Sequence, residues 1–124
     1  ELAVSPVWVG GDPALLRRVV DNLLTNAIKF SPHGKTVQVT VGVHRDKAML
    51  EVLDEGPGVP EEARSRIFEQ YEIVKMREAG GLQTGLGLAF CRMVVEAHGG
   101  QISCLGRRPV GSRFRVTLPL ATQD

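Results

Sequence analysis

The chain has 124 residues, 43% of them hydrophobic, which suits one domain built around one hydrophobic core. Its 15 basic and 14 acidic residues are scattered and leave a formal net charge of +1, so the charge favours neither nucleic acid nor an anionic membrane as a partner. No apolar run approaches the ~20 residues of a membrane span, and the first residues lack a signal-peptide pattern.

The first long element is predicted to be a helix from Pro13 to Phe30, after a short β-prone run at Val7–Gly10. Asp12 suits the N-cap, and proline is favoured at the first helical position. Residues that disfavour a helix follow Phe30, so the helical pattern ends there. An apolar face repeats at helical spacing: Leu16, Val20, Leu23 and Ala27.

Alternating, β-branched runs in the rest of the chain predict an antiparallel hairpin and, near the end, two closing strands. These strands are expected at Thr36–His44, Ala48–Leu53, Gln101–Leu105 and Ser112–Leu120. Residues Arg45-Asp46-Lys47 connect the two strands of the hairpin.

The remaining segments predict two more helices and a loop. A short helix is expected at Glu61–Ile67, after Pro60, and the weakly periodic stretch Glu72–Thr84 is expected to be a mobile loop. A second long helix is stopped by His98-Gly99-Gly100. Its predicted buried stripe is Leu86, Phe90, Met93 and Ala97.

The two cysteines are expected to be reduced. Neither Cys91 nor Cys104 belongs to a C-x-x-C pair, and neither has metal-ligand spacing to a histidine. This favours a cytoplasmic domain and leaves open whether the parent protein is anchored in a membrane. The abrupt start at Glu1 looks like that of a domain excised from a longer chain, so we expect residues 1–124 to form one such domain.

A polar stripe borders the apolar face of the first helix. Asn22, Asn26 and Lys29 stand at positions i, i+4 and i+7, although asparagine is a poor helix former. Amide oxygens at such positions can ligate a hard cation, and a lysine can contact phosphate. The alternative is a solvated helix edge.

Two glycine-containing segments complete the candidate site. Asp54 ends a strand and precedes Gly56 and Gly58, so its carboxylate can point into a pocket while the main chain passes close to a flat ligand. Gly85 and Gly87 stand at a helix start, where unpaired N–H groups favour an anion such as phosphate. Ordinary turns and close packing are the alternatives for both segments.

Four boxes in this order resemble the catalytic and ATP-binding domain of sensor histidine kinases, whose superfamily includes type II topoisomerase ATPase domains, mismatch-repair ATPases and heat-shock chaperones. The N box is Asp21–Phe30, the first glycine box Asp54–Gly58, the F box Ile67–Tyr71 and the second glycine box Gly85–Leu88. The resemblance covers essentially the whole chain. It departs from the family pattern at Tyr71, where a second phenylalanine is usual, and in a short lid between Tyr71 and Gly85.

The resemblance implies a two-layer α/β sandwich of the Bergerat type, with a mixed, mainly antiparallel sheet of about five strands packed on three helices. It also implies that Asn26 holds Mg²⁺ against the phosphates of ATP and that Asp54 accepts a hydrogen bond from the adenine amine. Lys75 or Arg77 is a candidate for the γ-phosphate, and the spacing does not choose between them. The implied nucleotide-binding set is Asn22, Asn26, Lys29, Phe30, Asp54, Gly56, Gly58, Thr84, Gly85, Leu86, Gly87 and Leu88.

The implied reaction is donation of the γ-phosphoryl group of Mg-ATP to a histidine on the protein's own dimerisation domain, with a response regulator downstream. The acceptor motif of such domains is absent from the sequence, so no catalytic residue is assigned here. His33, His44 and His98 are expected to be surface or capping residues. Two alternatives stay open: a serine kinase of the anti-sigma-factor type, and a nucleotide-binding regulatory module without transfer activity.

Overall fold

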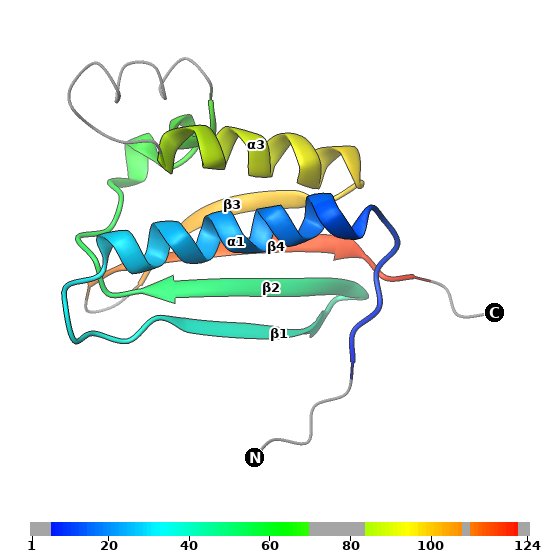
Figure 1. The fold of residues 1–124 in the computed structure, drawn as a ribbon, viewed down its shortest axis with the longest axis horizontal. Coiled ribbons are helices and arrows are strands. Elements are labelled where there is room, and N and C mark those ends of the chain that lie inside the picture. The colour runs from blue at the N-terminus through cyan, green and yellow to red at the C-terminus, as the bar shows by residue number, and fades with distance from the viewer. Residues whose placement is uncertain (1–5, 70–83, 108–109, 122–124) are drawn as a thin grey trace.

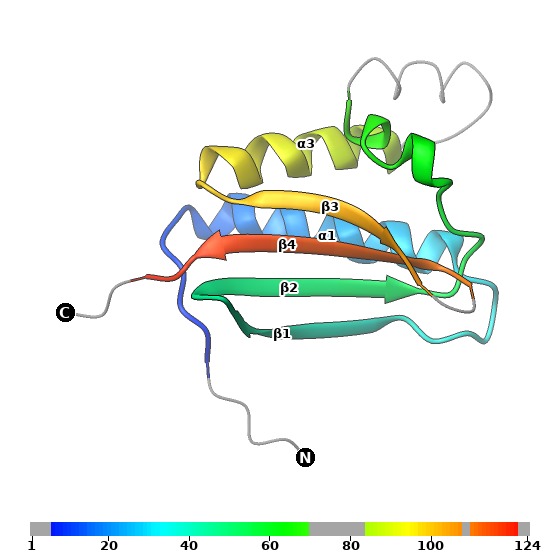
Figure 2. The ribbon, with the colours of Figure 1, turned by 180° about the vertical axis from the view of Figure 1, so that it is seen from behind.

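The computed structural model describes residues 6–69, 84–107 and 110–121 (Figure 1). They form a four-stranded antiparallel sheet with the strand order β1-β2-β4-β3. Helices α1 and α3 cover one face of this sheet, and the other face is open (Figures 1 and 2). The expected α/β sandwich is therefore confirmed, and its described strands are all antiparallel rather than mixed.

Helix α1 spans Pro13–Phe30, as predicted. Asp12 Oδ1 caps its start by accepting hydrogen bonds from the N–H groups of Ala14 (2.9 Å) and Leu15 (3.2 Å), which would otherwise lack partners. Helix α3 spans Thr84–Ala97. The short helix predicted at 61–67 is instead two single 3₁₀ turns, η1 at Glu61–Ala63 and η2 at Arg66–Phe68.

The four strands lie close to their predicted positions. They are β1 at Gln38–His44, β2 at Lys47–Asp54, β3 at Gln101–Gly106 and β4 at Ser112–Pro119. The β-prone run near the N-terminus contributes only an isolated bridge between Val9 and Leu120.

The hairpin between β1 and β2 turns in two residues rather than three. Arg45 and Asp46 have φ values of 53° and 63°, and two left-handed residues match the twist of the strands they connect. Lys47, expected in the connection, already pairs with His44 across the ladder.

The core lies between the sheet and the two long helices. Its fully buried side chains are Leu23, Val52, Cys91 and Val95. The rings of Phe68 and Phe114 pack edge to face with centroids 6.1 Å apart, which connects η2 to β4. Burial raises the pKa of the Cys91 thiol to about 12 and that of Cys104 to about 11, so both sulfurs stay protonated at neutral pH.

The predicted buried face of α3 is only partly correct: Phe90 is partly buried against the core, but two other residues are exposed. Met93 is 63% exposed and Ala97 is also exposed, whereas Leu88, Cys91, Val94 and Val95 enter the core. On α1, Val19 is buried although the predicted stripe omitted it. The Arg18 guanidinium lies 4.2 Å from the centre of the Phe90 ring, and this cation–π contact bridges α1 and α3.

His98 links the end of α3 to the start of α1. Its Nδ1 donates to the Val94 carbonyl (2.8 Å), and its Nε2 accepts from the Asp12 N–H (3.1 Å). A Cβ on Gly11 would overlap the imidazole ring. The expectation of a capping role for His98 is therefore confirmed.

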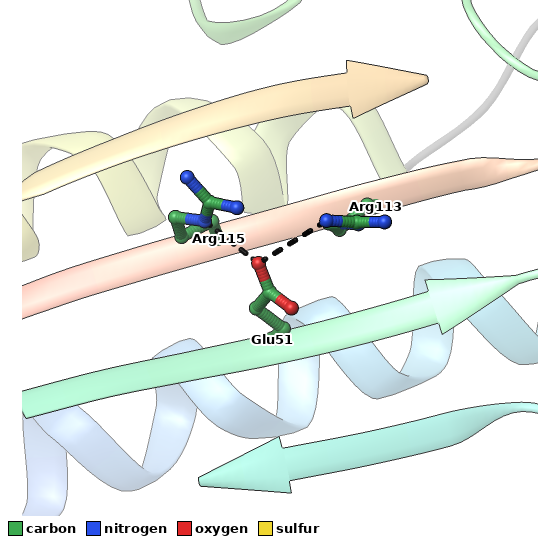
Figure 3. A network of polar contacts seen from close by, with 3 residues as sticks. All are labelled: Glu51, Arg113 and Arg115. Atoms are coloured by element: carbon green, nitrogen blue, oxygen red, sulfur yellow. Dashed lines mark hydrogen bonds and ion pairs between the residues drawn. The ribbon is translucent and has the colours of Figure 1, made fainter. Parts of the chain in front are cut away.

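The open face of the sheet carries a charge cluster (Figure 3). Glu51 on β2 accepts a hydrogen bond from Arg115 Nε (2.7 Å) and lies 3.9 Å from Arg113 Nη1, both on β4. Because Glu51 and Val52 point to opposite faces of β2, this cluster is separate from the core.

Neither of the described helices has the length and apolar character needed to cross a membrane.

Replacement of Leu23 by alanine should lower the free energy of unfolding by about 2–5 kcal/mol, because it leaves a cavity at a side chain that is only 1% exposed. Ile28→Ala on the same helix is the matched control: Ile28 is 66% exposed, and its truncation should change stability by about 0.5 kcal/mol or less. Urea denaturation followed by circular dichroism measures both. Equal losses would contradict the described packing of α1.

Candidate nucleotide-binding site

Asp54 is held by the main chain of two separate segments. It ends β2, is only 4% exposed, and pairs with Ser112 at the start of β4. Its Oδ1 accepts hydrogen bonds from the N–H groups of Gly56 (2.9 Å) and Ser112 (3.2 Å). Because both bonds fall on Oδ1, they fix the rotation of the carboxylate and determine where Oδ2 points.

Glycine is required around Asp54 by close main-chain approaches. A Cβ on Gly56 would lie 2.5 Å from the Phe30 carbonyl oxygen, at the end of α1. A Cβ on Gly111 would overlap the Asp54 carbonyl oxygen, and φ at Gly111 is +119°. Gly58, with φ of +83°, faces the Gly111 carbonyl. The first glycine box thus packs against the end of α1 on one side and the start of β4 on the other.

Helix α1, which carries the polar stripe, lies beside both glycine boxes. Asn26 is 5% exposed, Asn22 is half-buried, and Lys29 is exposed in the last turn. At the other end of the stripe, a Cβ on Gly87 would lie 3.2 Å from Asn22 Cγ. Gly56 therefore meets α1 at Phe30, and Gly87 meets it two turns earlier at Asn22.

The other predicted site residues lie at the end of α1, in α3, or outside the described part of the chain. Phe30 is 42% exposed at the end of α1, and Leu88 is buried in the core, which leaves only the main chain of Leu88 to a ligand. Thr84, Gly85 and Leu86 form the first turn of α3. Lys75, Arg77 and the rest of the expected mobile loop before Thr84 lie outside the described residues.

Side chains that the sequence analysis did not assign hold the first glycine box in place. Ser31 Oγ accepts from the Glu55 N–H (3.1 Å), and Glu55 Oε2 accepts from the Thr36 N–H (3.1 Å). Arg107 Nη1 donates to the Asp54 carbonyl (3.2 Å), and Arg64 Nε donates to the Val59 carbonyl (2.9 Å). Serines after a helix and arginines in loops are common, so residue type alone does not mark these roles.

This arrangement combines groups that suit a nucleotide. An oriented carboxylate lies at one end, a buried amide lies on α1, and the first turn of α3 supplies main-chain N–H groups that favour anions. Among the described residues, no three histidine, cysteine or acidic side chains gather as a metal site. A cation here would therefore depend on the amide of Asn26 and on oxygens of the ligand, a donor set that suits Mg²⁺.

The family model and the relatives found by comparison with known proteins agree with one another. The family model for histidine kinase-, DNA gyrase B-, and HSP90-like ATPases matches residues 11–122. The adaptive-response sensory kinase SasA of Gloeothece citriformis is 43% identical over 119 residues, which cover 94% of this chain and 29% of SasA. The chain spans only 13% to 30% of the length of such curated relatives.

Solved structures agree with this match. The mycobacterial sensor histidine kinase MprB has a TM-score of 0.76 and 32% identity, covering 93% of this chain and 76% of that one. Full-length ShkA, solved in complex with AMPPNP, has a TM-score of 0.78 and 31% identity over 95% of this chain and 24% of that one. The chain therefore belongs to the histidine kinase-, DNA gyrase B- and HSP90-like ATPase family, as an ATP-binding domain of the sensor histidine kinase type.

Proposed function

We propose that residues 1–124 form the catalytic domain that binds Mg-ATP and donates its γ-phosphoryl group to a histidine on a separate dimerisation domain of the same protein. A response regulator would receive the phosphoryl group downstream, and the domain would act in the cytoplasm. The observation that carries the proposal is the close approach of both glycine boxes to α1, Gly56 at the main-chain carbonyl of Phe30 and Gly87 at the side chain of Asn22. This proximity supports a site in which the groups proposed for the base and for the phosphates lie along one helix.

Asp54 is proposed to select the base. Its Oδ1 is occupied by the N–H groups of Gly56 and Ser112, so Oδ2 is the oxygen assigned to the exocyclic amine of adenine. Gly56 and Gly58 would shape the base pocket, because without side chains they let the main chain after Asp54 lie close to Phe30 and Gly111. A guanine base would instead present a carbonyl to the carboxylate, and two acceptors repel each other.

Asn26 is proposed to hold Mg²⁺, with Asn22 assisting and Lys29 contacting phosphate oxygens. A bound Mg²⁺ would neutralise charge on the phosphates during transfer. The amide of Asn26 has little freedom to move because it is 5% exposed within a helix. The first turn of α3, from Thr84 to Gly87, would orient the phosphates through its main-chain N–H groups.

The acceptor is proposed to lie on another domain, because two of the three histidines of this chain, His44 and His98, are poorly placed to receive phosphate. Both ring nitrogens of His98 are hydrogen-bonded. His44 lies at the opposite end of the sheet from Asp54. The first-listed relative, SasA, is a sensory kinase more than three times the length of the matched segment, which leaves room for such a domain.

Two alternatives remain. A serine kinase of the anti-sigma-factor type would use a similar ATP site but transfer phosphate to a protein serine. A regulatory module would bind ATP and transfer nothing. The named sensor kinases among the relatives favour the histidine kinase.

Asn26→Ala should weaken binding of ATP in the presence of Mg²⁺ by about 10- to 150-fold, since it removes a polar contact to a charged group. Affinity for ATP without Mg²⁺ should change much less. Isothermal titration calorimetry of the domain, with and without Mg²⁺, measures both. Thr25→Ala, an exposed neighbour on α1, is the control. An Asn26→Ala variant that keeps the full Mg²⁺ effect would contradict the metal assignment.

Asp54→Asn should weaken ATP binding by about 5- to 150-fold and reduce the preference for ATP over GTP. The amide oxygen of the substituted side chain would keep the N–H donors of Gly56 and Ser112, so its NH₂ group would take the place of Oδ2. That NH₂ group opposes the adenine amine but can donate to the guanine carbonyl. Competition by ATP and GTP against a fluorescent nucleotide tests this. A wild-type domain that binds both nucleotides equally would refute the role of Asp54.

The isolated domain should bind ATP without labelling itself, and addition of the histidine-bearing dimerisation domain should restore transfer. Alignment of donor and acceptor by a partner domain can contribute ~7–11 kcal/mol to lowering the barrier. Incubation with γ-labelled ATP should yield acid-labile, base-stable phosphate only on the added domain. Phosphohistidine at His33, His44 or His98 would overturn the proposal, and phosphoserine on an added protein would favour the serine kinase.

A further inference from the structure

Two arginines donate to main-chain carbonyls at the start of the first glycine box and directly after its end. Arg107, which follows β3, donates from Nη1 to the Asp54 carbonyl (3.2 Å). Arg64, between η1 and η2, donates from Nε to the Val59 carbonyl (2.9 Å). The segment from Asp54 to Val59 is thus held at its first and last residues by side chains that the proposed mechanism does not use.

Both arginines lie at the same end of the sheet. A Cβ on Gly106, the last residue of β3, would lie 2.9 Å from Arg64 Nη2, so the guanidinium packs against the main chain there. Cys104, two residues earlier, has a pKa raised by burial, lowered by the charge of Arg64 and raised by that of Asp54. Arg64, Asp54 and the end of β3 therefore share one corner of the domain.

The position of Asp54 depends on its main chain as well as its carboxylate. Gly56 and Ser112 fix Oδ1, but these bonds set the direction of Oδ2 only if the residue itself does not shift. The Asp54 carbonyl lies against Gly111, in a space that excludes a Cβ, and Arg107 supplies a donor to that carbonyl. Without the Arg107 donor, the half-buried carbonyl of Asp54 would lack this hydrogen bond, and Asp54 would shift towards another donor.

We propose that Arg107 and Arg64 are positioning residues for recognition of the adenine amine, and that they act by holding the ends of the Asp54–Val59 segment. This rests on the proposed function, because it requires that Asp54 meets the adenine base. Neither guanidinium is assigned a contact with the nucleotide. Their effect should therefore depend on the group that the base presents to Asp54, and not on the phosphates.

The test compares ATP with purine riboside triphosphate, whose base lacks the exocyclic amine but whose sugar and phosphates are unchanged. Both nucleotides are titrated, with Mg²⁺ present, into the full chain and into Arg107→Ala, Arg64→Ala and the double variant. Each single variant should bind ATP about three- to tenfold more weakly, as expected for one lost hydrogen bond. Affinity for purine riboside triphosphate should stay within about twofold of wild type, because that nucleotide gains nothing from Asp54.

Two further variants separate positioning from general effects. Arg17→Ala removes the same charge from an exposed position in the first turns of α1 and should leave both affinities unchanged. Arg107→Lys keeps a cationic donor and should recover part of the lost discrimination. Equal weakening of both nucleotides in Arg107→Ala and Arg64→Ala would overturn the proposal, since it would indicate a phosphate contact or a general loss of structure.

The same titrations distinguish this inference from the proposed function. If the wild-type chain prefers ATP and the arginine variants retain that preference, the positioning role is wrong while the role of Asp54 survives. If the wild-type chain does not discriminate between the two nucleotides, both the contact of Asp54 with adenine and the positioning role are wrong.

Discussion

The approach of β4 to the end of β2 is the constraint on which the site depends. Ser112 can donate to the Asp54 carboxylate only because Gly111, directly before it, has no side chain to overlap the Asp54 carbonyl. Gly56 meets the same restriction on the other side, against the carbonyl of Phe30. Three segments distant in sequence therefore meet through their main chains, and they orient the buried carboxylate of Asp54.

Helices α1 and α3 are joined differently at their two ends. At the start of α1, His98 and Asp12 form hydrogen bonds that hold the helices together. At the other end, Gly87 brings the first turns of α3 against the polar stripe of α1 without a side chain between them. The first end stabilises the pair, and the second leaves main-chain N–H groups and amides available beside each other. This asymmetry explains why the candidate site lies at one end of the helix layer.

Local signals predicted much of this fold, and their failures have physical causes. Helix α1 was predicted with its observed ends because Asp12, Pro13 and the helix-disfavouring residues after Phe30 mark both. The buried face of α3 was predicted only in part because apolar residues surround this helix almost completely, so periodicity does not identify the side that meets the sheet. The Arg45-Asp46 turn was misjudged since it adopts positive φ without glycine or asparagine.

In the candidate site, too, residues that stand in a local sequence pattern were predicted, and residues without such a pattern were missed. Asp54, Gly56 and Asn26 were predicted as site residues because each stands in a local pattern that has a chemical meaning of its own. The donors Arg64 and Arg107 belong to no such pattern, because their partners are carbonyls of residues 5 and 53 positions away. Every residue has a main-chain carbonyl, so the sequence does not indicate which carbonyl will accept a hydrogen bond from an arginine. Candidate ligand-binding side chains can thus be predicted from sequence when they stand in such a pattern, whereas side chains that fix the main chain beneath them are identified only once the fold brings them to their partners.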